Sequence, residues 1–171
     1  MKHLKLVLPC RKYLSSYLSA LQEFSHEGKP IADVRVDLLK KAKDFPTYIK
    51  RISDDRQGKN LDANWVPATL FWAVLGDKAI GRLHLRHCLP KHGGHIGYAI
   101  KPSERGKGFA KKMLNLGLKK AKQIGIKKVY ITCDKDNLAS KAVIKANGGL
   151  LAKKYTKNRV KRLAFWIAIA K

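Results

Sequence analysis

The sequence has little of what marks a disulfide-rich, metal-binding or membrane protein. Its three cysteines show no Cys-x-x-Cys spacing, so neither a disulfide framework nor a zinc site is indicated. No apolar run approaches the roughly 18 residues that a membrane-spanning helix needs. The apolar run near the N-terminus is too short for a secretory signal and is interrupted by Lys5. We therefore expect a cytoplasmic protein with no metal site and no membrane partner.

Acidic residues are also scarce, and they are unevenly distributed. The 171 residues include 37 Lys and Arg against 12 Asp and Glu, which gives a net charge of +25. Residues 91–171 hold 21 of the basic residues and three acids, a net charge of +18, whereas eight acids lie between Glu23 and Asp62. A positive field attracts polyanionic ligands and promotes non-specific nucleic-acid binding, although lysines that keep a small protein soluble explain much of the same excess.

What the chain does have is the composition of a globular protein, 45% hydrophobic and 29% charged, and its length favours one domain. The spacing of apolar residues predicts strands at 4–8, 68–75, 78–87, 95–100, 127–133, 150–155 and 160–170, and helices at 11–26, 33–42, 46–52, 111–124 and 137–147. This order predicts an α/β fold with a mixed sheet covered by helices, rather than a doubly wound one.

The most informative stretch runs from Gly93 to Ala110. An apolar strand, His95–Ile100, is followed by a glycine-rich loop that opens a helix at about Gly108. Two glycines flank Lys107 in this loop, so no side chain separates the backbone N–H groups from a ligand. The helix start adds unpaired N–H donors and the positive end of a dipole. The stretch therefore predicts a phosphate-binding site.

A six-residue signature lies within this stretch, Arg105-Gly106-Lys107-Gly108-Phe109-Ala110. It fits the Arg/Gln-x-x-Gly-x-Gly/Ala pattern of the GNAT superfamily of acetyl-CoA-dependent N-acetyltransferases. The flanking sequences Gly-Gly-His-Ile-Gly-Tyr and Thr-Cys-Asp-x-Asp-Asn-x-x-Ser resemble a bacterial subgroup of predicted acetyltransferases in that superfamily. The resemblance extends over about residues 71–151. It implies a mostly antiparallel central sheet flanked by helices, in a single domain of residues 1–171. Within it, residues 1–65 would form an N-terminal strand and the substrate-side helices, and 66–171 the acetyl-CoA-binding core.

The resemblance also implies which residues bind acetyl-CoA, the acyl donor. The strand before the signature would pair with the pantetheine arm through its backbone, and the amides of residues 106–110 would hold the pyrophosphate. Two residues at a later helix start would line the other side of the site. The implied contacts are Ile100, Arg105, Gly106, Lys107, Gly108, Phe109, Ala110, Asn137 and Ser140.

Several of these residues also fit structural roles. Arg105 either reaches a phosphate or braces the loop by binding a carboxylate such as Glu104. Phe109, at the helix start, also fits the core. Asn137 is a preferred helix N-cap, in which case Ser140 is simply close to it.

The chemistry that the resemblance implies is direct attack of a neutral amine on the thioester. A base or a water chain takes the proton of the amine, and an acid protonates the departing thiolate. Many family members place a tyrosine seven residues after the position of Asn137, but this chain has Ile144 there. His95 and Tyr98 are therefore the candidate catalytic residues, although a strand histidine beside two glycines equally fits a structural hydrogen bond.

The acceptor is predicted only as a primary amine, either a small amine or the lysine or N-terminal amine of a peptide. The resemblance places the substrate side in the acid-rich segment, which would attract a cation, although the same acids fit ion pairs on solvated helices. A second hypothesis is a weakly catalytic or non-catalytic module that holds RNA or a ribosomal or acidic partner. The +18 half and the missing tyrosine favour it, while the intact signature and the lack of aromatics interleaved with lysines disfavour it. A monomer and a homodimer are both compatible with the sequence.

Overall fold

The structure, a computed structural model, describes residues 3–27 and 45–169. In these ranges the strands form two antiparallel sheets, one in the order β1-β2-β3-β4 and one in the order β5-β7-β6. The strands are β1 Leu4–Val7, β2 Ala68–Leu75, β3 Lys78–Arg86, β4 Ile96–Ile100, β5 Lys128–Asp134, β6 Leu150–Lys157 and β7 Val160–Ala168. The helices are α1 Arg11–His26, α3 Phe45–Gln57, α4 Phe109–Gln123 and α5 Leu138–Ala146, with a short 3-10 turn, η2, at Pro102–Glu104. The predicted α/β class with a mostly antiparallel sheet is confirmed.

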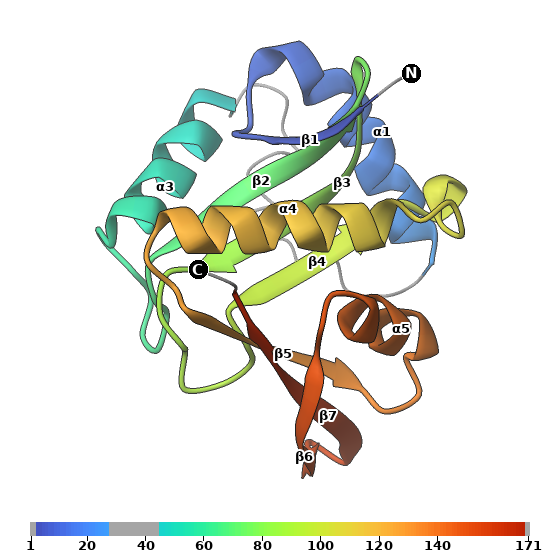
Figure 1. Cartoon of the computed structure of the whole chain (residues 1–171). Coiled ribbons are helices and arrows are strands. Elements are labelled where there is room, and N and C mark those ends of the chain that lie inside the picture. The colour runs from blue at the N-terminus through green and yellow to red at the C-terminus, as the bar shows by residue number, and fades with distance from the viewer. Residues whose placement is uncertain (1–2, 28–44, 170–171) are drawn as a thin grey trace.

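The four-stranded sheet is covered on both faces. In Figure 1, α1 and α3 lie on one side of it and α4 crosses the other. Tyr17 of α1 and Tyr48 of α3 stack with Trp72 of β2, and the ring centroids of Tyr17 and Trp72 are 4.2 Å apart. On the opposite face, Met113 and Leu114 of α4 pack into a second cluster. Because both faces are buried, β2 is apolar along almost its whole length instead of alternating.

The three-stranded sheet is buried on one face only. Val129, Ile131 and Cys133 of β5 belong to the core that α4 covers. The alternating residue Tyr130 therefore points to the opposite, outer face, together with its register partner Trp166 of β7. β6 is the edge strand, and its side chains are exposed or half-buried along its whole length. This sheet presents its outer face and its β6 edge to solvent.

The two sheets join just before β4 begins. The His95 amide donates to the Tyr130 carbonyl (N···O 2.7 Å), and the Tyr130 amide donates to Nδ1 of His95 (2.9 Å). Gly94 allows this approach, because a Cβ built on it would lie 2.4 Å from the Tyr130 carbonyl oxygen. Beyond this contact, Figure 1 shows β4 and β5 diverging toward the side on which α4 begins and α5 lies. The junction thus ties the two strands together at one end only.

Most elements lie within two residues of their predicted ranges. The strand predicted from His95 begins at Ile96, since His95 makes the junction between the sheets. The helix predicted at 46–52 extends to Gln57, with its proline in the first turn. The predicted helix at 33–42 lies outside the described residues. Among the described helices, none has the length and apolar character needed to cross a membrane.

Candidate functional site

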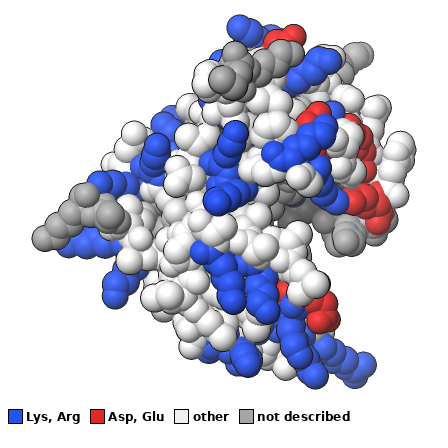
Figure 2. Space-filling view, turned by 45° about the vertical axis from the view of Figure 1, so that its right-hand side comes forward, with Lys and Arg blue, Asp and Glu red and all other residues white. Residues whose placement is uncertain are grey.

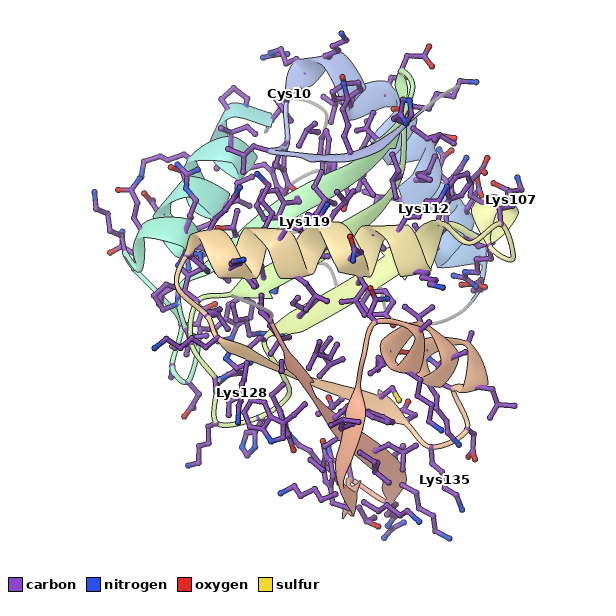
Figure 3. The ribbon with its side chains drawn as sticks, viewed as in Figure 1. Cys10, Lys107, Lys112, Lys119, Lys128 and Lys135 are labelled. Atoms are coloured by element: carbon purple, nitrogen blue, oxygen red, sulfur yellow. The ribbon has the colours of Figure 1, made fainter. Side chains whose placement is uncertain are left out.

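The glycine-rich loop connects η2 to α4. Gly106 and Gly108 have φ angles of +75° and +78°, a conformation that residues with side chains rarely adopt. A Cβ at either position would meet nothing within 4 Å, so this side of the loop is open. Gly108 is the N-cap of α4, and no side chain caps the helix start. Lys107 lies at the tip of the loop (Figure 3). The loop and helix start thus have the features of an anion-binding helix N-terminus.

Arg105 holds this loop against α1. Its Nε donates to the Ile100 carbonyl at 2.9 Å, and its two terminal nitrogens donate to the two carboxylate oxygens of Glu27 at 2.5 and 2.9 Å. A bidentate arginine–carboxylate pair fixes both position and orientation. This contact fits the bracing role, one of the two that the sequence left open, with Glu27 as the carboxylate. Glu104 pairs instead with Lys107, at 3.0 Å.

Glu23, one helical turn before Glu27, holds the turn that precedes the loop. Its carboxylate accepts hydrogen bonds from Nζ of Lys101 (2.8 Å) and from the amide of Ser103 (3.0 Å). Burial acts to raise the pKa of Glu23, but these hydrogen bonds outweigh it and lower the pKa to about 2. Two residues of the acid-rich segment therefore position the glycine-rich loop.

Three other acids of that segment form ion pairs, two within α3 and one in the loop that follows it. Asp54 lies 2.8 Å from Nζ of Lys50, and Arg51 lies 3.7 Å from Asp55 and 3.4 Å from Asp62. These contacts fit the ion-pair interpretation of the segment better than a patch that attracts a cationic acceptor. Residues 28–44 of the segment lie outside the described part of the chain.

Asn137 and Ser140 lie at the start of α5. Oδ1 of Asn137 accepts the Ser140 amide (2.9 Å), which is the capping role that the sequence allowed, and the residue is otherwise exposed. The Ser140 hydroxyl lies 3.0 Å from the hydroxyl of Tyr98 on β4. This hydrogen bond links β4 to α5 on the side where β4 and β5 diverge.

Tyr98 of β4 lies within electrostatic range of Cys133 of β5, and both side chains are protonated at neutral pH. Burial raises the pKa of Tyr98 to about 12, although the Ser140 hydrogen bond opposes the shift. Tyr98 can therefore donate a proton. Burial also raises the pKa of the Cys133 thiol, which makes it a poor nucleophile. Ile144, at the family's common tyrosine position, is fully buried in the core and supplies no donor.

His95 lies apart from Tyr98, at the junction of the sheets. It is 6% exposed, and its ring lies 6.5 Å from that of Trp166. Burial lowers the pKa of His95, the backbone hydrogen bond with Tyr130 opposes this shift, and the positive charge of Arg86 adds to it. An Nδ1 that accepts the Tyr130 amide carries no proton, so the ring is neutral. This geometry fits the structural alternative for His95, and the two candidate catalytic residues are not brought together.

The other predicted contacts divide between core and surface. Ile100 is buried and presents its carbonyl to Arg105, while Phe109 and Ala110 are half-buried and pack against the core. Gly106 and Lys107 are exposed. In residues 3–27 and 45–169 no group of three His, Cys, Asp or Glu side chains is arranged to hold a metal ion.

Sequence reasoning did not find Glu23, Glu27 or Gly94. The two carboxylates contact residues that lie 78 to 80 positions away in the sequence. Local residue spacing therefore cannot predict these contacts. The available signal was the clustering of acids in a strongly basic chain. Gly94 lies in the informative stretch, but its close approach to β5 follows only from the tertiary structure.

Known proteins resemble the chain in sequence and in fold. Residues 32–149 match the family model described as an acetyltransferase (GNAT) domain. A search of curated proteins finds no match. Among solved structures, the ribosomal-protein-S5-alanine acetyltransferase from Vibrio fischeri has a TM-score of 0.76 at 17% identity, over 99% of this chain and 94% of that one. The microcin C7 self-immunity acetyltransferase MccE, solved with acetyl-CoA and AMP, has a TM-score of 0.69 at 19% identity, over 97% and 92%. A spermidine N-acetyltransferase chimera from Vibrio cholerae and hSSAT has a TM-score of 0.65 at 17% identity, over 96% and 95%.

The sheet arrangement, the open glycine-rich loop and these similarities together define an enzyme of the acetyltransferase class. Because the family model covers more than half of the chain, the protein belongs to the GNAT acetyltransferase family. The predicted family, fold class and enzyme class are thereby confirmed.

Proposed function

We propose that the protein transfers the acetyl group of acetyl-CoA to a primary amine, which attacks the thioester directly in a ternary complex. The hydrogen bond between Tyr98 and Ser140 carries this proposal. It orients a protonated hydroxyl carried by β4, the strand that, by the family resemblance, pairs with the pantetheine arm. That hydroxyl supplies the acid that Ile144 cannot supply from its usual position.

The coenzyme is proposed to bind along β4 and the glycine-rich loop. The amides of residues 106–110 hold the pyrophosphate, with Arg105 and Glu27 bracing the loop behind them. Ile100 contributes backbone contacts to the pantetheine arm, and the exposed side chains of Lys107 and Asn137 lie at the rim. The solved complex of MccE with acetyl-CoA, on the same fold, supports this donor.

The reaction requires two proton transfers. The amine nitrogen loses a proton as it bonds to the carbonyl carbon, and the sulfur gains one as the carbon–sulfur bond breaks. Tyr98 is proposed as the acid that protonates the thiolate, with Ser140 holding its hydroxyl in position. His95 is proposed as a positioning residue that keeps β4 and β5 joined, and the proton of the amine leaves through water.

The acceptor is proposed to be a peptide amine or a polyamine in the cytoplasm. Two proteins of similar fold are named for such acceptors, the alanine of ribosomal protein S5 and spermidine. Both acceptors offer a primary amine, the group that the proposed reaction acetylates.

A transfer assay with labelled acetyl-CoA tests the proposal. The acceptors are spermidine, a peptide with a free N-terminal alanine, and a lysine peptide with a blocked N-terminus. Product is expected with at least one of them. Gly108→Val should abolish transfer and the stabilisation by acetyl-CoA, whereas the matched variant Gly125→Val, at a φ of +82° beyond the other end of α4, should retain both. The proposal fails if acetyl-CoA neither stabilises the wild-type protein nor reacts with any acceptor.

A second candidate function is a binding module that holds RNA without catalysis. Figure 2 shows lysine and arginine side chains spread over the visible face, with the acidic ones gathered mainly in one area. This distribution and the buried Ile144 favour the module. Thermal shifts separate the two functions, because a module would be stabilised by a short RNA and not by acetyl-CoA.

A further inference from the structure

A cavity lies away from the glycine-rich loop, against the outer face of the three-stranded sheet. Its volume is about 650 Å³, and it is lined by the loop before β4 and by parts of β5, β6 and β7. The side chains that carry its chemistry are Lys91, Tyr130, Lys153, Tyr155, Lys157 and Trp166. The acetyl-transfer proposal assigns no role to this cavity.

A register shift in β6 determines which face of the sheet its lysines occupy. Leu151 pairs with a core residue of β7, and the register shifts between Leu151 and Lys153. One extra residue in a strand sends every later side chain to the other face. Lys153, Tyr155 and Lys157 therefore share the outer face with Trp166. On this face β6 places one aromatic residue, the half-buried Tyr155, between Lys153 and Lys157.

The aromatic residues Tyr130, Tyr155 and Trp166 line the cavity. The rings of Tyr130 and Trp166 are 4.8 Å apart and tilted by 57°, and Trp166 is 37% exposed. Nζ of Lys153 lies 5.4 Å from the ring centroid of Tyr155. Aromatic rings stack on the planar, uncharged bases of nucleotides, and neighbouring lysines attract the phosphate group.

The charge of the cavity has a single sign. Lys91, Lys153 and Lys157 line it, and among the residues that the structure describes no carboxylate does. Within the described part of the chain, none of these three lysines pairs with an acid. A ligand with a phosphate group would therefore meet unneutralised cations, while a cationic ligand would be repelled.

We propose that this cavity binds a phosphorylated nucleoside. The base stacks on Tyr155 and Trp166, and Lys153 and Lys157 hold the phosphate. The volume is within the range of small-ligand sites. A free mononucleotide and one nucleotide of a single-stranded nucleic acid present this same chemistry, and the experiment below distinguishes these sources.

The cavity is separate from the proposed coenzyme site. It is lined by Gly93 and Tyr130, where the sheets join, and by no residue of β4 or of the glycine-rich loop, where the coenzyme is proposed to bind. Acetyl-CoA and the second ligand should therefore bind together. The inference does not depend on acetyl transfer.

Calorimetric titration of the full chain, saturated with acetyl-CoA, tests the proposal with two probes, AMP and a ten-nucleotide oligouridylate. The cavity variant is Lys153→Ala with Lys157→Ala. Its matched control is Lys119→Ala with Lys122→Ala, which removes the same charge from two exposed positions of α4. Figure 3 labels Lys119. We expect the cavity variant to weaken binding about tenfold and the control less than about twofold. Tyr155→Leu should also weaken binding about tenfold through lost stacking.

The outcomes separate as follows. Binding of AMP that is lost in the cavity variants identifies a free nucleotide, and binding of the RNA alone, lost in the same variants, identifies a single-stranded nucleic acid. Equal losses in both lysine pairs would mean non-specific attraction and would overturn the proposal, as would binding of neither probe or competition with acetyl-CoA. So would light scattering that finds a dimer which Trp166→Ala dissociates, because a second copy would then fill the cavity. Thermal unfolding checks that each variant is folded, and stabilisation by acetyl-CoA in the same samples reports separately on the coenzyme site.

Discussion

The two sheets of this protein differ in how deeply they bury a tryptophan. Trp72 in the four-stranded sheet is fully buried between α1 and α3, whereas Trp166 in the three-stranded sheet is 37% exposed beside a cavity. The difference follows from the number of layers, since helices cover both faces of the first sheet and only one face of the second. The first sheet gives a rigid support for the glycine-rich loop. The second leaves an aromatic, basic surface available for binding.

Replacing each tryptophan by alanine tests this contrast most directly, and Trp72→Ala should have the largest effect of the changes considered. Removing a fully buried aromatic side chain that stacks on Tyr17 should lower the free energy of unfolding by about 3–5 kcal/mol. Trp166→Ala should lower it by about 1 kcal/mol, since the side chain is already partly in water. Denaturant titration followed by circular dichroism measures both. Similar losses of unfolding free energy in the two variants would contradict the finding that the three-stranded sheet is buried on one face only.

Tyr98→Phe tests the hydrogen bond that joins β4 of the first sheet to α5. It should lower kcat about 100-fold, or about 2.7 kcal/mol, because the acid for the thiolate is lost, while acetyl-CoA affinity changes less than about threefold. Ser140→Ala, which only releases the hydroxyl, should cost about tenfold. Since the pKa of Tyr98 is about 12, the wild-type kcat should show no alkaline decline up to about pH 10. A decline near neutral pH would point to another acid.

Gly94→Ala tests the junction itself. The new methyl group would overlap the Tyr130 carbonyl oxygen, so β4 and β5 must move apart, at a cost of about 2 kcal/mol of stability. Gly97→Ala is the matched control, because nothing lies within 4 Å of that position and it should be neutral or slightly stabilising. Denaturant midpoints measure the difference. If the two variants are equally stable, the close contact of the sheets is not required.

Glu23→Gln should have the smallest effect, a decrease of a few degrees in melting temperature at neutral pH, because the hydrogen-bonded charge is lost. The folded-state pKa of about 2 lies below the ordinary 4.5, so the folded state binds fewer protons. Its stabilisation is therefore present above pH 4.5 and is lost as the pH falls through about 2. The gap between wild type and variant should shrink over that window. Glu104→Gln, in an exposed pair with Lys107, is the control and should change little.

Local patterns were sufficient to predict the glycine-rich loop and its place between a strand and a helix. Gly106 and Gly108 have the positive φ angles that such a loop requires, and a strand and a helix flank it as expected. Both features depend on residues within a few positions of each other. The fold class followed for the same reason, because helical and strand periodicities are local.

Contacts between distant segments were not predictable in this way. The bond from Arg105 to Glu27, and that from Tyr98 to Ser140, each needed the tertiary arrangement to select one partner among several polar residues. The shift after Leu151 is local, but its effect on Lys153 depends on the register with β7. Sequence reasoning therefore found the glycine-rich loop and missed the cavity beside β6.

Three of the 12 acids gather at the glycine-rich loop, where they pair with Lys101, Arg105 and Lys107. If the loop binds the coenzyme as proposed, its donors are uncharged backbone amides, whereas within the described residues the cavity lysines pair with no acid. A ligand held by neutral amides displaces few counterions, while one held by lysines must displace them. Ionic strength should therefore separate the two sites, so that rising salt releases the nucleotide from the cavity while the coenzyme stays bound.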